Sequence, residues 1–386
     1  IGTLTGLTPG LHVNLVSLIV LSLSPILLQF TSPIVLGIFI ISLAMTQTFL
    51  DALPGIYLGA PDESQALNVL PGHRFLLRGE GHLAVVYNTL GSLGCVLLSL
   101  LLFPLFIWSM DLVYPFVKGI MGYLLALIMA FMIGKEKKKW LPSLTAFLLA
   151  GILGVLVLGS NMKQPLFPLL SGMFGFSLLF VSLKDKVKIP LQNSNSIPNI
   201  SQKNMVKSIS AATGMGFISA FLPGFGNSQA AIVATNIVGD VGDEGFLAIV
   251  GGLNTASMLI SIAAVYVLDK ARNGAIVVVK DLVDKVGFSE LLLFLGAALF
   301  AAGMGAIFAL KLSKVFSKHI AKVNYTRLIM GIMAFITLLT FFFDGFLGLL
   351  VLLTSTAIGL VASHWGVGKN HLMGCLILPV ILYFIL

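Results

Sequence analysis

Long runs of apolar residues, separated by short polar segments, follow one another along the whole chain. Several runs reach the ~20 residues that a helix needs to cross the hydrocarbon core of a bilayer. They lie at about 11–28, 33–50, 83–108, 112–134, 140–160, 165–183, 208–222, 225–238, 246–268, 289–312, 327–343, 345–362 and 371–386. This pattern predicts an all-α polytopic membrane protein.

A polar segment at 184–204 divides the apolar runs into two sets. It contains Pro190, Pro198 and many Asn and Ser residues without helical periodicity, which is typical of a loop. Each set opens on a Pro-Gly pair, and a polar cluster, an interrupted stretch and a long span follow in the same order. We therefore expect a first transmembrane repeat at 1–183, a cytoplasmic linker at 184–204 and a second transmembrane repeat at 205–386.

The composition and the charge pattern agree with a membrane location. The chain is 58% hydrophobic and only 10% charged, whereas an ordinary soluble domain has about a quarter charged residues. Its net charge is +8, but the lysines and arginines gather in short loops, as the positive-inside rule expects. We therefore expect a multi-pass protein of the cell (cytoplasmic) membrane in contact with lipid, and no nucleic-acid partner.

Equivalent loops in the two sets differ in charge. The loop at 311–327 is strongly basic, whereas its equivalent at 104–118 is nearly uncharged. This difference indicates two repeats of inverted topology, of the kind that builds transporters from broken helices and re-entrant hairpins. The basic loops, including "KEKKK" at 135–139, are placed in the cytoplasm.

Two Pro-Gly breaks stand at matching positions of the repeats. Proline removes a backbone donor, and a helix that restarts after the break presents unpaired N–H groups and a positive dipole end that suit an anion. A proline kink or close helix packing is the alternative at each break. The predicted substrate-binding residues are Thr8, Pro9, Gly10, His12 and Asn14 at the first break, and Pro223, Gly224, Gly226, Asn227 and Ser228 at the second.

Two polar clusters follow inside the apolar runs. Asp51 is a candidate for coupling to H⁺ or Na⁺, because an ionisable residue within a span marks function by default; the alternative is an interfacial cap of the next turn. The neutral residues are expected to line the pathway, with interhelical hydrogen bonding as the alternative. The predicted ion-coupling or pathway residues are Thr46, Gln47, Thr48, Asp51, Asn254, Thr255 and Ser257.

Other polar segments give weaker signals. The stretch 59–84 is too polar and too broken by proline to span a membrane alone, and we expect a re-entrant hairpin followed by an interfacial helix. His364 and His371 flank a basic loop and are expected to be solvated. No Ser-His-Asp order, phosphate-binding loop, dinucleotide fingerprint or metal quartet is visible, so we expect neither an enzyme, nor a metal site, nor a cofactor beyond a coupling ion.

Three stretches resemble the large membrane permease of the tripartite tricarboxylate transporters (TctA-like). They are "GTLTGLTPGLHVN" (2–14), "GAPDESQALNVLPGHRFLLRGEGHLA" (59–84) and "FLPGFGNSQAA" (221–231). The chain departs from that family in "AMTQTFLDALPGIYLGAP" (44–61), where a Gly-Gly-Ser-rich stretch is usual, and in "LPGH" (70–73). It is therefore identified as a divergent, archaeal-type member.

The resemblance implies secondary transport of small carboxylates by ion-driven symport. It also implies two partners, a small membrane subunit and an extracytoplasmic binding protein; a homodimer is one option for the oligomeric state. A translocase for a lipid-linked anion, such as a polyprenyl phosphate, is the alternative function, because helix starts and amides suit a phosphate equally well.

Overall fold

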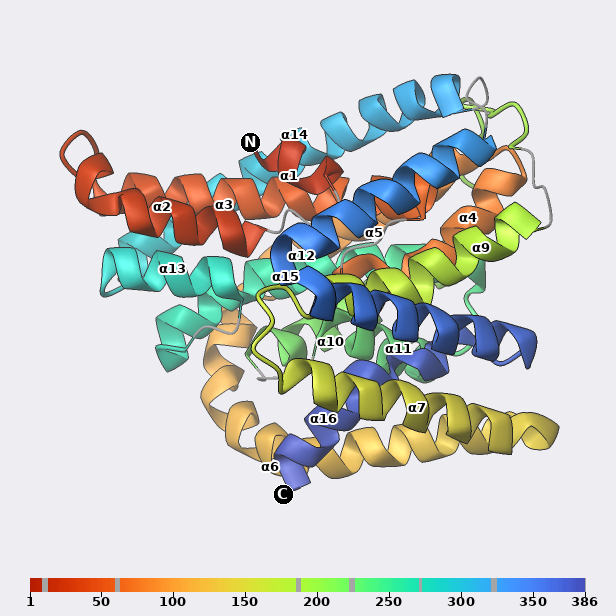
Figure 1. Ribbon diagram of the computed structural model, residues 1–386. Coiled ribbons are helices and arrows are strands. Elements are labelled where there is room, and N and C mark those ends of the chain that lie inside the picture. The colour runs from red at the N-terminus through yellow and green to blue at the C-terminus, as the bar shows by residue number, and fades with distance from the viewer. Residues whose placement is uncertain are drawn as a thin grey trace.

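The structure is a computed structural model that describes residues 1–8, 13–59, 63–184, 189–221, 226–270, 273–320 and 325–385. All regular secondary structure in these ranges is helical. Figure 1 shows the long helices packed side by side, with α6, α7 and α16 at one edge and α1, α2 and α3 toward the other.

The first half of the chain contributes helices of very different lengths. They are α1 (Gly2–Leu7), α2 (Val13–Leu27), α3 (Pro33–Leu50), the π-helix η1 (Pro54–Leu58), the 3-10 helix η2 (Glu63–Asn68), α4 (Val69–Leu77), α5 (Gly81–Leu101), α6 (Phe103–Lys135), η3 (Lys137–Lys139), α7 (Trp140–Leu158), α8 (Leu166–Leu170), the π-helix η4 (Ser171–Phe176) and α9 (Ser177–Lys184).

The second half contains fewer and longer helices. They are α10 (Gln202–Phe221), α11 (Asn227–Val238), α12 (Gly242–Leu268), α13 (Gly274–Val283), α14 (Phe288–Ile320), α15 (Tyr325–His364), η5 (Lys369–Met373) and α16 (Gly374–Ile385). The backbone of α15 is broken at Gly345, which has a φ of 58°, a conformation that glycine adopts without steric cost.

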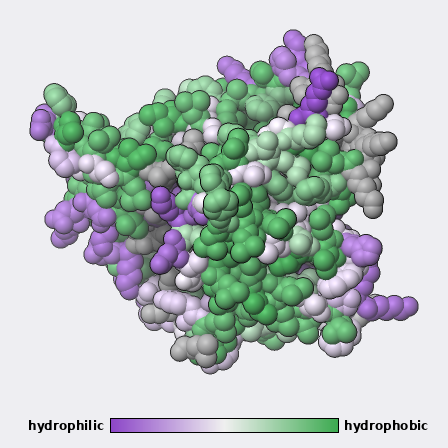
Figure 2. Space-filling model, in the orientation of Figure 1, coloured by the Kyte–Doolittle hydropathy of each residue, from purple (hydrophilic) through white to green (hydrophobic). Residues whose placement is uncertain are grey.

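Membrane-length helices confirm the predicted polytopic class. Among the described residues, six helices are long and apolar enough to cross a bilayer: Pro33–Leu58, Gly81–Leu101, Trp140–Leu158, Gly242–Leu268, Phe288–Ile320 and Ile329–His364. A seventh candidate is α6, whose parts 103–116 and 119–135 meet at 77° close to Pro115. Hydrophobic residues cover most of the face in Figure 2, as a lipid-facing surface requires.

Helices of the first half pack against helices of the second half. α5 lies along α12 and α3 along α14, while α7 packs on α16 and α15 on η4. Small residues permit the close approach: a methyl group added to Gly91 of α5 would overlap the carbonyl oxygen of Ala248 on α12. Within α12, 94% of the spanning window is buried, which makes α12 the central helix. The repeat boundaries and their inverted orientation stay predictions.

The segment after α9 is held against the turn between α4 and α5. Gln192 accepts a hydrogen bond from the Gly81 backbone at 3.0 Å and donates one to the Leu76 carbonyl at 2.9 Å. The backbone N–H of Asn193 donates to the Gly79 carbonyl at 2.7 Å. Hydrogen bonds therefore hold the described part of the predicted linker against one end of the bundle.

The basic segment 135–139 meets the turn before α16 at this protein's predicted cytoplasmic side. Lys139 donates to the Gly366 carbonyl at 2.8 Å. His371 is fully buried, and its Nε2 lies 3.2 Å from a carboxylate oxygen of Glu136. The expectation that His371 is solvated is therefore wrong, because its imidazole is enclosed by the protein and meets Glu136.

Candidate functional site

A chain of hydrogen-bonded side chains joins α3, α12 and α11 inside the protein. Asn254 donates from Nδ2 to Oδ2 of Asp51 at 2.6 Å, and its Oδ1 accepts from Nδ2 of Asn227 at 3.1 Å. The Ser219 hydroxyl lies 3.4 Å from Oδ1 of Asn227. Asp51 and Asn254 are buried, with exposed fractions of 5% and 8%. One ionisable group and two amides thus meet in the interior, drawn from both halves of the chain.

The local backbone explains why these side chains are free to meet. Asp51 ends α3, and its backbone N–H still donates to the Gln47 carbonyl. The chain then continues into η1, a π-helix of the kind that recurs at functional sites. Asn227 is the first residue of α11 and follows the extended backbone of Gly226. It therefore stands where a helix leaves backbone N–H groups unpaired and carries a positive dipole end.

A second cluster surrounds the start of α13. The backbone N–H of Ala275 donates to Oδ1 of Asn14 and to Oδ1 of Asn273, both at 3.0 Å. Nδ2 of Asn273 lies 3.3 Å from the Met258 sulfur. Met258 follows Asn254 by one turn of α12, roughly 6 Å along the axis. The two clusters therefore occupy consecutive turns of α12, next to the starts of α11 and α13.

The prediction that Asn14 and Asn227 share one anion stays a prediction. The two amides bond to different partners: Asn14 accepts from the first turn of α13, and Asn227 donates to Asn254. Five of the predicted substrate-binding residues, namely Pro9, Gly10, His12, Pro223 and Gly224, lie outside the described residues.

Most of the predicted site residues that carry a hydroxyl group donate a hydrogen bond to a backbone carbonyl of their own helix. Such bonds reach a carbonyl three or four residues earlier. They are Thr8 to Leu4, Thr46 to Ser42, Thr48 to Met45, Thr255 to Gly251 and Ser257 to Asn254. Ser228 is buried on the first turn of α11. The Gln47 side chain is also buried, and its Oε1 has no hydrogen-bond partner among the described residues.

Sequence patterns did not single out several residues of these clusters. Ser219, Met258 and Asn273 lie in apolar or loop segments, although Asn273 before "GAIVVV" carries an N-cap signal. A further polar network was also missed: the Tyr57 hydroxyl lies 2.9 Å from Oγ of Ser313, which lies 2.9 Å from Nδ1 of His82. This network ties α5 and η1 to α14.

The geometry provides a hydrogen-bonded polar cluster inside a bundle whose buried residues are mostly apolar. Amide N–H groups and helix starts can hold an anion without the cost of burying a paired cation. A buried carboxylate can take up H⁺ or a hard cation. The membrane-length helices with this polar centre define a polytopic membrane protein.

Comparisons with known proteins agree with this class. Residues 1–374 match the family described as the tripartite tricarboxylate transporter TctA family, and the chain belongs to that family. An uncharacterized protein of Methanocaldococcus jannaschii is 29% identical over 396 residues, which cover 100% of this chain and 96% of the relative. No solved structure matches the chain. The predicted family is thereby confirmed, and the archaeal relative agrees with the predicted archaeal type.

Proposed function

We propose that this chain is a permease that carries a small organic anion, such as a carboxylate, by secondary transport driven by an ion gradient. The family assignment supports transport as such. The observation that carries the finer proposal is the hydrogen-bonded chain from Asp51 through Asn254 to Asn227. In this proposal, Asp51 exchanges the coupling ion, and the neighbouring amides of Asn254 and Asn227 bind the anion.

The charge of Asp51 supplies the coupling in this proposal. A carboxylate that is buried beside a bound organic anion repels it, because like charges interact strongly away from water. Uptake of H⁺ or Na⁺ by Asp51 removes the repulsion, so anion and coupling ion bind together. Gln47, one turn before Asp51, has a buried side-chain oxygen without a described partner, which is the type of ligand that hard cations take.

Anion binding falls to the amides and helix starts. Asn227 and Asn254 each have an amide group that can turn from its present partner to a carboxylate oxygen. Alternating access then requires motion of one repeat against the other around this centre. The contacts between α5 and α12 and between α3 and α14 join the two halves, so these helices would slide past each other.

The family also frames the partners and the location. We propose that the chain works in the cell membrane with a small membrane subunit and an extracytoplasmic binding protein, as the tripartite family implies. The family assignment does not favour the alternative, a translocase for a lipid-linked anion.

Binding of labelled mono-, di- and tricarboxylates to the purified protein, with uptake into cells that hold the partner subunits, tests the proposal. We expect Asn227→Ala and Asn254→Ala to lower affinity for the bound carboxylate at least tenfold. Asn236→Ala is the matched control, because Asn236 lies on the same α11 but donates to its own helix at Ile232. Unchanged binding and uptake in both site variants would show that the anion lies elsewhere.

A further inference from the structure

A cavity of about 310 Å³ lies between η2 and α4, the start of α12 and the turn η5. Leu67, Leu70, Phe174 and Phe246 are among its lining residues, so much of the wall is apolar. Fixed charges also reach it from α4, α12 and η5. An apolar cavity with a few polar groups is the usual form of a small-molecule site.

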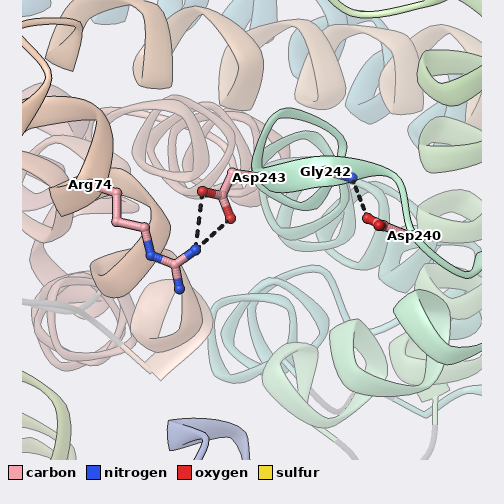
Figure 3. A network of polar contacts seen from close by, with 4 residues as sticks. All are labelled: Arg74, Asp240, Gly242 and Asp243. Atoms are coloured by element: carbon pink, nitrogen blue, oxygen red, sulfur yellow. Dashed lines mark hydrogen bonds and ion pairs between the residues drawn. The ribbon is translucent and has the colours of Figure 1, made fainter.

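One cation at the cavity is neutralised by a carboxylate. Nη1 of Arg74 lies 2.9 and 3.1 Å from the two carboxylate oxygens of Asp243. Figure 3 shows that the other terminal nitrogen of Arg74 is turned away from this carboxylate. The Gly242 backbone N–H donates to Asp240 at 3.0 Å and fixes the turn before α12. Arg74 therefore keeps donors for a second acceptor.

The other cation has no carboxylate partner among the described residues. Nζ of Lys369 donates to the Ser177 hydroxyl at 2.9 Å and to the Phe174 carbonyl at 3.4 Å. An ammonium has three donors, so one N–H remains. Lys369 is partly buried, and this removal from water lowers its pKa to about 8.

The charges that face the cavity therefore leave one positive charge unbalanced. Asp243 offsets Arg74, and nothing described offsets Lys369. His73 of α4 adds no charge at neutral pH, because burial lowers its pKa to about 4. A bound anion would complete the third hydrogen bond of Lys369 and balance its charge.

We propose that this cavity binds a compact anionic group carried on an apolar body. Lys369 and Arg74 hold the anion, and the leucine and phenylalanine side chains hold the body. The site is distinct from the Asp51 cluster, since Asp243 and Asn254 are separated by eleven positions on α12, roughly 16 Å of helix. It lies beside the turn that meets the basic segment 135–139, on the predicted cytoplasmic side.

Two sources offer this chemistry, a free carboxylate with an apolar tail and an anionic lipid. The full-length protein in nanodiscs separates them. Lys369 is acetylated with acetic anhydride at pH 8, and its modification rate is measured by peptide mass spectrometry against the exposed Lys138. An anion on Lys369 raises the fraction of charged amine and shields it, which slows acetylation.

In phosphatidylcholine nanodiscs, we expect hexanoate to slow modification of Lys369 at least fivefold, and acetate, which lacks the apolar body, to have little effect. This result identifies a free carboxylate as the ligand. Slow modification without hexanoate in nanodiscs that contain phosphatidylglycerol, compared with phosphatidylcholine alone, identifies a lipid. The proposal fails if neither hexanoate nor phosphatidylglycerol protects Lys369, or if acetate protects as well as hexanoate.

A cavity-filling variant provides a second test. Leu70→Trp places an indole in the cavity and should abolish the protection while Lys369 still reacts. Leu77→Trp is the matched control, because Leu77 lies at the other end of α4 and is not among the lining residues. Equal protection in both variants would contradict the site. The comparison of hexanoate with acetate in the native protein remains decisive if the Leu70 variant does not fold.

Discussion

Asn254 donates a 2.6 Å hydrogen bond to Asp51, although the two residues stand 203 positions apart and belong to different halves of the chain. The bond ties the end of α3 to the middle of α12. Through the same amide, the carboxylate is linked to the first residue of α11. A change in the charge of Asp51 therefore alters hydrogen bonds that involve helices of both halves.

The first prediction concerns this carboxylate. Asp51→Asn keeps the size of the side chain and removes its charge, so the variant should bind the transported anion without needing H⁺ or Na⁺. Accumulation driven by an ion gradient should fall at least tenfold, while exchange of labelled for unlabelled anion persists. Counterflow and gradient-driven uptake in proteoliposomes distinguish the two activities, with Asp51→Glu as the charged control. Gradient-driven accumulation at the native level in Asp51→Asn would remove Asp51 from the coupling step.

The second prediction concerns the contact between α5 and α12. A side chain at Gly91 would collide with the backbone of Ala248, so Gly91→Ala should force the helices apart and cost about 1–3 kcal/mol. Gly296→Ala on α14 is the control, because nothing lies within 4 Å of the added methyl group. Thermal unfolding in detergent measures both. Equal unfolding temperatures for the two variants would mean that the contact is not close.

The third prediction concerns the start of α13. Asn14 and Asn273 both accept from the Ala275 N–H, so removing one cap leaves the other. Asn14→Ala or Asn273→Ala alone should lower stability by less than the ~1 kcal/mol typical of a lost cap. The double variant should cost more than the sum of the two, a non-additivity that a thermal double-mutant cycle detects. Strict additivity would show that the caps act independently.

The fourth prediction concerns pH and His73. The pKa of His73 is lowered from 6.5 to about 4; burial is the main cause, a hydrogen bond to the Ile56 backbone opposes it, and the charge of Lys369 adds to it. Between these values the unfolded chain binds more protons than the folded protein, so stability falls as pH decreases from 6.5 toward 4. The full loss is about 3 kcal/mol, at ~1.4 kcal/mol per pH unit.

Unfolding temperatures across this pH range measure the effect. His73→Gln should flatten the dependence, because glutamine does not titrate. His319, which is exposed on α14, supplies the control variant His319→Gln, which should retain the native slope. An unchanged slope in His73→Gln would assign the acid sensitivity to another group.

Much of the architecture was predictable because membrane helices are recognised in a sequence by their length and hydropathy. The ends of α3 and α12 fall close to the ends of the apolar runs, whereas the run predicted at 83–108 contains both the end of α5 and the start of α6. Asp51 and Asn254 were each selected from sequence as buried polar residues in a span. Their mutual hydrogen bond was not predicted, because helical periodicity relates residues within a turn or two and carries no information across 203 positions.

The remaining misses have similar causes. Asn273 follows a polar loop, so its cap on α13 was hidden among ordinary turn residues. His371 lies in a basic loop and was expected in solvent, but η5 folds it inward against Glu136. No feature of the sequence indicated that Lys369 is partly buried, since a single lysine next to a loop is usually a solvated charge. Burial of such residues depends on which segments meet, and that is a property of the whole bundle.

The packing of first-half helices against second-half helices has a consequence for how the protein is synthesised. The glycine-bearing face of α5 is completed by α12, whose first residue is Gly242. Translation must therefore run through more than a hundred further residues after α5 before that face finds its partner. During this interval the glycine-bearing face of α5 contacts lipid or the insertion machinery. The α5–α12 contact can form only after the second half has been synthesised.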